Sequence, residues 1–218
     1  VERLGAAVAG ASGRSIPWTF YLVADAEPNA FTVGEGYVFV TDGLLRLKLT
    51  DDELAGVLAH EVAHGMLRHS ERGSDQEREV ARAMQELEEA QALADRYEDE
   101  YRRESGDPNA LDRYRSKIVT ARRRVEQARA RLKSVGYQLE HEQEYSHADE
   151  IDADLKGLEV TARAGYDPEG LARALLKLQQ YGVQKFGEAA LQGGRTHPPI
   201  ARRVEILQRV YANWRSRR

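Results

Sequence analysis

Apolar residues are spaced differently in the first 50 residues and in the rest of the chain. Residues 1–10 show the three- and four-residue spacing of a short amphipathic helix. Residues 16–23 and 36–41 are rich in β-branched and aromatic side chains, which favours strands, and the turn residues 27–29 lie between them. We therefore expect a small sheet of about three strands here, arranged as a short hairpin or meander.

Beyond residue 50 the apolar spacing is helical almost throughout. Thr50 and Glu53 match the capping-box pattern directly before an apolar series, which predicts a helix over residues 51–69. Another helix is expected over residues 138–164, and a helix over 198–215 closes the chain. The sequence therefore predicts an α+β fold that is mostly helical, with a small sheet on its N-terminal side.

Two highly charged segments, 75–104 and 111–139, carry apolar residues in steps of three and four on either side of a turn rich in Gly, Asp, Pro and Asn. This pattern predicts an antiparallel coiled-coil helical hairpin, inserted as residues 73–137. The alternative is a pair of ordinary surface helices packed on the body of the protein. We assign residues 1–72 and 138–218 to one domain. The positions expected along the seam of the first hairpin helix are Val80, Met84, Leu87, Ala94, Tyr97 and Tyr101.

Composition narrows the possible partners and chemistry. The 32 Lys and Arg against 36 Asp and Glu give a net charge of −4, so we expect no nucleic acid partner. No apolar run reaches the roughly 18 to 20 residues of a membrane span, and the chain begins with neither Met nor a signal peptide. We therefore expect membrane attachment only through segments absent from this chain. The lack of cysteine excludes disulfides, thiolate zinc ligands and cysteine nucleophiles.

Residues 60–64 read H-E-V-A-H and lie within the helix predicted over 51–69. Four residues advance a helix by about 400°, so His60 and His64 lie on one face, where both imidazoles can bind one Zn²⁺. Glu61 lies about 100° round the helix, near the metal but outside the ligand row, as a general base should. At this composition roughly 0.02 chance matches are expected, which makes the motif specific.

A zinc enzyme needs a third protein ligand and an open fourth position. Within the helix predicted over 138–164, Glu150 and Asp154 lie one turn apart on a shared face, and His147 precedes Glu150 by three residues. Glu150 can bind the metal while Asp154 supports a zinc-bound imidazole, and His147 is a rival third ligand. Taken alone, such an acidic helix is more often a solvated surface.

Six short segments occur in an order known from one enzyme family. They are residues 29–31, 36–45, 53–64, 150–154, 164–168 and 196–199. Together they resemble the HtpX and CaaX-prenyl-protease family of zinc metallopeptidases, close to its soluble periplasmic type that acts on outer-membrane proteins. The resemblance implies a zincin-like catalytic domain of the gluzincin type, with one Zn²⁺ per chain. It makes Glu150 the third ligand, Asp154 the acid that supports the ligands, and His147 a bystander.

Residues 196–199 form a rigid loop that presents His197 before the last helix, and Arg203 follows six residues later. The simplest interpretation is that His197 only begins that helix. The resemblance instead implies that His197 and Arg203 flank the zinc and assist the transition state. The imidazole then either stabilises the oxyanion or fills the open coordination position as an inhibitory fourth ligand. His69 lies off the ligand face and is expected to be solvated.

In enzymes of this kind an extended substrate adds to an exposed sheet edge through backbone hydrogen bonds. We expect this edge in the strand region before the zinc helix, while the apolar side chains of Val38 and Val40 are ordinary core. The residues predicted to form the substrate edge are Asn29, Ala30, Gly36, Tyr37 and Val38.

The sequence therefore predicts a zinc-dependent endopeptidase, in which His60, His64 and Glu150 bind Zn²⁺ and Glu61 activates water. The resemblance suggests unfolded or misassembled proteins as substrates and a bacterial periplasm or envelope as the location. The alternative is a latent protease that acts mainly as a chaperone or assembly factor, with the hairpin binding an envelope protein or a second copy. A purely structural zinc is disfavoured because three nitrogen and oxygen ligands leave a position open.

Overall fold

A computed structural model of the chain describes residues 1–33, 36–67, 73–104, 107, 109–142, 146–193 and 197–216. His69 and Thr196 lie outside these ranges. The chain forms two compact units, one made of Val1–Gly73 with Glu140–Arg218 and the other of Ser74–Leu139.

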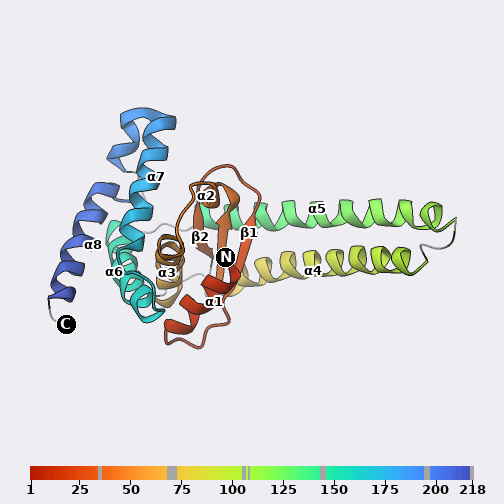
Figure 1. Cartoon of the computed structure of the whole chain (residues 1–218), viewed down its shortest axis with the longest axis horizontal. Helices are drawn as coiled ribbons and strands as arrows, with labels where there is room; N and C mark the ends of the chain where they lie inside the picture. Colours follow the sequence, from red (N-terminus) through yellow and green to blue (C-terminus); the bar gives the residue numbers. More distant parts are fainter. Residues whose placement is uncertain are drawn as a thin grey trace. The chain divides into compact units, whose positions relative to one another are not determined.

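The larger unit is mostly helical, with one small sheet near its N-terminus, as the sequence predicts (Figure 1). Among the described residues, none of the helices is both long enough and apolar enough to cross a bilayer. The elements of the larger unit are α1 (Glu2–Ala11), β1 (Thr19–Val23), β2 (Ala30–Val33), β3 (Tyr37–Thr41), α2 (Asp42–Arg46), α3 (Asp51–Leu67), α6 (His147–Arg163), α7 (Gly170–Phe186), η1 (Gly187–Gln192) and α8 (Ile200–Arg215).

The three strands lie in the order β1-β3-β2. β2 and β3 form the expected antiparallel hairpin, in which Phe31 pairs with Phe39 and their rings stack at 5.0 Å. β1 instead pairs with β3 in parallel, so the sheet is not a meander. The strand order makes β3 the central strand and leaves β2 at an edge of the sheet.

This topology corrects part of the predicted substrate edge. Tyr37 and Val38 lie on β3 and pair with strands on both sides, so their backbone is not open to a peptide. The carbonyl of Asn29 accepts a hydrogen bond from the N–H of Thr41, and the carbonyl of Gly36 accepts one from Thr19. Of the five residues expected at the edge, Ala30 on β2 is the one that remains there.

Helix α3 forms the centre of the larger unit and packs against α1, α6, α7 and β2. Glu53 and Thr50 close its capping box, since each side-chain oxygen accepts the backbone N–H of the other residue. Two glycines allow close helix contacts. A Cβ atom on Gly56 would lie 2.4 Å from the backbone nitrogen of Leu171 in α7, and one on Gly157 in α6 would lie 3.0 Å from the backbone nitrogen of His60. The second contact places α6 directly against the H-E-x-x-H turn.

The expectation of one continuous helix over 138–164 was wrong. Helix α5 ends at Glu142, and α6 begins at His147 after an N-cap at Ser146. The Ser146 hydroxyl accepts the N–H of Asp149, whose carboxylate accepts the N–H of Ser146. This reciprocal cap at Ser146 begins a new helix, whose first residue is His147.

The smaller unit contains nearly all of α4 (Gly73–Arg103) and most of α5 (Ala110–Glu142), which run side by side as a helical hairpin (Figure 1). Alanines fill much of the seam, and Ala83 occupies the position that the sequence analysis gave to Met84. Ion pairs between described residues join the helices, among them Arg131 with Glu86 at 2.7 Å and Arg122 with Glu98 at 2.8 Å. The packed cluster at its centre consists of Ala90, Ala94, Ala121, Val125 and Ala128.

Candidate metal centre

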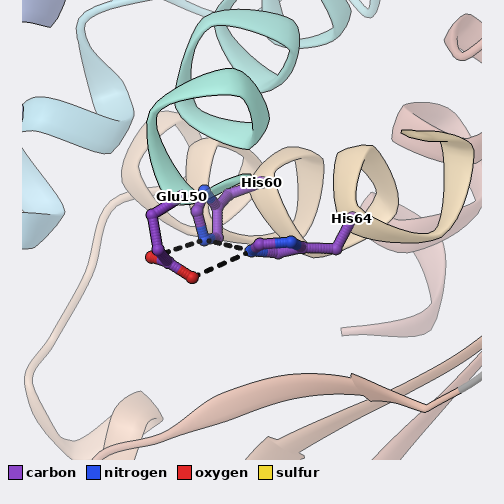
Figure 2. Close-up of side chains that lie close together, drawn as sticks. All are labelled: His60, His64 and Glu150. Atoms are coloured by element: carbon purple, nitrogen blue, oxygen red, sulfur yellow. Dashed lines mark hydrogen bonds and ion pairs between the residues drawn. The ribbon is translucent and has the colours of Figure 1, made fainter. Parts of the chain in front are cut away.

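Three buried side chains point toward one another where α6 crosses α3 (Figure 2). His60 and His64 come from successive turns of α3, and their Nε2 atoms lie 3.1 Å apart. Glu150 comes from the first turn of α6, with Oε1 at 3.2 Å from His64 Nε2 and Oε2 at 3.7 Å from His60 Nε2. The three residues therefore form one cluster of nitrogen and oxygen atoms.

The cluster fits a zinc ion. Tetrahedral zinc with bonds of about 2.0 to 2.1 Å separates its ligand atoms by about 3.3 Å. The two nitrogens lie 3.1 Å apart, and each lies 3.2 or 3.7 Å from one of the two Glu150 oxygens. Among the described residues, neither buried oxygen of Glu150 accepts a hydrogen bond of regular geometry. Two imidazole nitrogens and a buried carboxylate that face one another are the donor set that zinc binds in proteins.

Asp154 supports the cluster from behind. Its Oδ1 atom lies 3.0 Å from His60 Nδ1, which fixes the imidazole tautomer with the lone pair on Nε2, toward the cluster. Arg203 donates from Nε and Nη2 to the two Asp154 oxygens at 2.8 and 2.7 Å. Its Nη1 atom lies 3.1 Å from Glu150 Oε2. The guanidinium thus holds both carboxylates at once.

Both carboxylates are ionised near neutral pH. Burial opposes their charge, but His197 and His64 beside Glu150 outweigh it and hold the pKa of Glu150 well below its usual range. For Asp154, hydrogen bonds from Arg203 and His60 likewise outweigh burial and lower the pKa. The site therefore offers a charged oxygen ligand to a cation without first losing a proton.

Glu61 lies beside the ligands on α3 and is buried. Burial raises the pKa of Glu61 to about 7, with the nearby charge of Glu150 adding to the effect against the opposing influence of His60. A carboxylate with such a pKa can both take up and release a proton near neutral pH. Its Oε2 atom lies 3.0 Å from the hydroxyl of Thr32 on β2, a contact that the sequence analysis did not anticipate.

His197 lies at the rim of the cluster. Its Nδ1 atom is 2.9 Å from Glu150 Oε2, while its side chain is 61% exposed. His147 is exposed at the start of α6 and does not belong to the cluster, in agreement with the family resemblance. The structure thus brings together the predicted His60, His64, Glu150, Asp154, Arg203 and His197, with Glu61 beside them.

A comparison with protein-family models matches residues 1–210 to peptidase family M48. The chain belongs to this family. In family M48, His60, His64 and Glu150 are the zinc site, which confirms the metal predicted from the sequence and makes the chain a metallopeptidase domain.

Individual relatives of this M48 domain are larger proteins. It is 30% identical over 197 residues to the beta-barrel assembly-enhancing protease of Yersinia pestis. That alignment covers 88% of this chain and 34% of the relative. It is 42% identical over 71 residues to the mitochondrial metalloendopeptidase OMA1 of Schizosaccharomyces pombe, covering 32% and 21% of the two chains. A protease HtpX homolog of Syntrophobacter fumaroxidans is 50% identical over 48 residues, covering 20% and 17%. The chain thus spans about a third or less of these relatives.

Proposed function

We propose that this M48 domain is an endopeptidase that cleaves extended segments of unfolded or misassembled proteins. The observation that carries the proposal is the position of β2, an edge strand that packs against the zinc helix α3. An edge strand recognises a peptide through its backbone, so it favours substrates whose backbone is accessible.

The register of the sheet supports a choice of the β2 groups that would bind a peptide. The carbonyl of Asn29 bonds to Thr41 on the β3 side, and alternate residues of an antiparallel strand face opposite sides. The N–H and C=O groups of Ala30 and Thr32 therefore point away from β3, and of the two residues Ala30 is the one that is partly exposed. A substrate strand paired there gains hydrogen bonds whatever its side chains are.

The side chains around the cluster support a hydrolytic mechanism without a covalent intermediate. His60, His64 and Glu150 would hold the zinc ion, which when bound would supply Lewis acidity toward a water molecule and the scissile carbonyl. Glu61 takes the proton from the attacking water and transfers it to the amide nitrogen that leaves as an amine. Glu61 gives up the same proton that it accepted, so its carboxylate is ionised again after the peptide bond breaks.

Arg203 and His197 take different roles in this proposal. The guanidinium of Arg203 is engaged by Asp154 and Glu150, so it positions the ligands rather than meeting the substrate. The exposed imidazole of His197 is within reach of the reacting groups. It either stabilises the oxyanion or closes the open coordination position. A His197→Ala variant separates these roles, because the first predicts a loss of activity and the second a gain.

The helical hairpin favours a second candidate function. The α4–α5 pair has its own packed seam and cross-helix ion pairs, so it presents a long charged surface that the catalytic chemistry does not use. In this alternative the domain is a latent protease that acts mainly as a chaperone or assembly factor, with the hairpin binding an envelope protein. Relatives named as beta-barrel assembly-enhancing proteases support a bacterial periplasm or envelope as the location.

The first experiment compares ribonuclease A in its native form and in its reduced, carboxymethylated form as substrates of the zinc-loaded chain. We expect cleavage of the unfolded form only, its loss on chelation, and a decrease of about a hundredfold or more in Glu61→Gln. Glu159→Gln, an exposed glutamate on α6, is the matched control. Zinc binding without any cleavage by the parent would favour the latent chaperone, and equal cleavage of both forms would overturn the proposed substrate class.

A further inference from the structure

Thr32 on the edge strand β2 contacts the proposed general base on α3. Its hydroxyl oxygen lies 3.0 Å from Glu61 Oε2 and 2.8 Å from the backbone carbonyl oxygen of Glu61. Thr32 is 1% exposed and Glu61 is 7% exposed. The contact is therefore shielded from water, which would otherwise compete for the carboxylate.

We propose that Thr32 is a positioning residue that holds the Glu61 carboxylate in the orientation needed to accept a proton from the attacking water. This inference rests on the proposed role of Glu61. In the part of the chain that the structure describes, the Thr32 hydroxyl provides the hydrogen bond to that carboxylate. A glutamate has three side-chain torsions, and without this bond its carboxyl group can turn away from the cluster.

The same hydroxyl hydrogen is shared with the backbone carbonyl oxygen of Glu61, so one three-centre contact ties both the backbone and the side chain of this residue to β2. The backbone N–H and C=O of Thr32 point away from β3, as those of the partly exposed Ala30 on the same strand do. The strand that is proposed to pair with the peptide therefore also carries the side chain that orients the base. Reaction rates respond steeply to this kind of alignment.

Two substitutions separate the hydroxyl from the shape of the side chain. Thr32→Val keeps a β-branched side chain of nearly the same size and leaves the backbone edge intact, but removes the hydroxyl. Thr32→Ser keeps the hydroxyl. Thr161→Val is the matched control, since Thr161 is fully buried and its hydroxyl bonds to Gly157 within α6. All three are compared with the zinc-loaded parent on carboxymethylated ribonuclease A.

For Thr32→Val we expect kcat to fall by about tenfold to a hundredfold, the range for loss of a hydrogen bond to a charged group, with KM within about twofold. Thr32→Ser should recover most of kcat, and Thr161→Val should match the parent. An unchanged kcat in Thr32→Val, an equally low kcat in Thr32→Ser, or an effect on KM alone would overturn the proposal.

A second measurement does not depend on activity. In metal-free protein labelled with ¹³C-glutamate, the carboxylate infrared band of Glu61 is the one that disappears in Glu61→Gln. We expect this band to shift in Thr32→Val and to stay in place in Thr32→Ser and Thr161→Val. An unshifted band refutes the positioning contact even if the parent cleaves nothing. A shifted band in a chain whose Glu61→Gln variant remains active would refute the role of Glu61 instead.

Discussion

His60 Nδ1 lies 3.0 Å from Asp154 Oδ1, so the helix that carries two zinc ligands is joined to the helix that carries the third by a bond that also fixes an imidazole tautomer. Arg203 holds the other side of Asp154 through two hydrogen bonds. A chain of contacts thus runs from α8 through α6 to the ligand on α3. Each link of this chain predicts a separate effect of mutation.

Asp154→Asn should weaken zinc binding by about tenfold to a hundredfold, because the amide is a poorer acceptor for His60 Nδ1–H and lowers the basicity of the ligand nitrogen. Competition with a chromophoric chelator measures the affinity. Asp152→Asn, an exposed acid two residues earlier on α6, is the control and should bind zinc as the parent does. Equal affinities of the two variants would contradict the supporting role of Asp154.

Arg203→Met should destabilise the metal-free protein by about 3 to 5 kcal/mol. Arg203, Glu150 and Asp154 are all buried, and removing the cation leaves Asp154 without its main partner and takes a positive charge away from Glu150. Arg203→Lys should recover only part of this loss, since an ammonium cannot bind Asp154 through a planar fork. Urea unfolding in the presence of chelator measures the effect. Exposed Arg202→Met should change stability by no more than about 1 kcal/mol.

Stability should fall in acid partly because of Glu53 at the start of α3. Burial opposes its charge, but hydrogen bonds from Lys177 Nζ at 2.6 Å and from the backbone of Thr50 outweigh it and lower the pKa of Glu53. A lowered folded-state pKa adds stability above the unfolded pKa of about 4.5, and this stability is lost as the pH falls through the folded-state value.

The Glu53→Gln variant tests this dependence. The parent should be more stable than the variant at pH 7, and the difference should shrink as the pH falls below about 4.5. Urea unfolding at a series of pH values measures it, with exposed Glu2→Gln on α1 as the control. A difference between parent and Glu53→Gln that stays constant from pH 7 to acid would show that the ionised carboxylate is not the source of the stability.

The zinc ligands could be predicted from the sequence because His60 and His64 are local neighbours on one helix. Their spacing alone places both imidazoles on one face. The third ligand could not be predicted from spacing, because the residues alone left both Glu150 and His147 as candidates. The family resemblance decided for Glu150. The contact of Arg203 with Asp154 spans 49 positions and follows from helix packing that no periodicity encodes. The resemblance predicted that Arg203 lies near the zinc, but it did not predict that Arg203 contacts Asp154.

The strand order was the main feature that the sequence did not predict. Local patterns located β1 and β3, but the parallel pairing of Thr19 with Tyr37 depends on how the chain returns across the sheet. Because that order was missing, Tyr37 and Val38 were assigned to an edge that β2 occupies. Thr32 was missed for the same reason. A threonine within a strand carries no motif, and its role depends on which helix packs against that strand.

Close helix packing around the zinc site leads to the last prediction, a pair of Gly→Ala variants with opposite effects. A Cβ atom on Gly56 would lie 2.4 Å from the backbone nitrogen of Leu171, so α3 and α7 would have to separate. Overpacking of this kind typically costs about 1 to 3 kcal/mol, which exceeds the gain of up to about 1 kcal/mol from replacing a helical glycine.

A Cβ atom on Gly10 in α1 would meet nothing within 4 Å, so only the gain remains. Thermal unfolding should therefore show a lower Tm for Gly56→Ala and an equal or higher Tm for Gly10→Ala. A Tm for Gly56→Ala at or above that of the parent would mean that the α3–α7 contact yields without cost, and that close backbone packing does not fix the helix that carries His60 and His64.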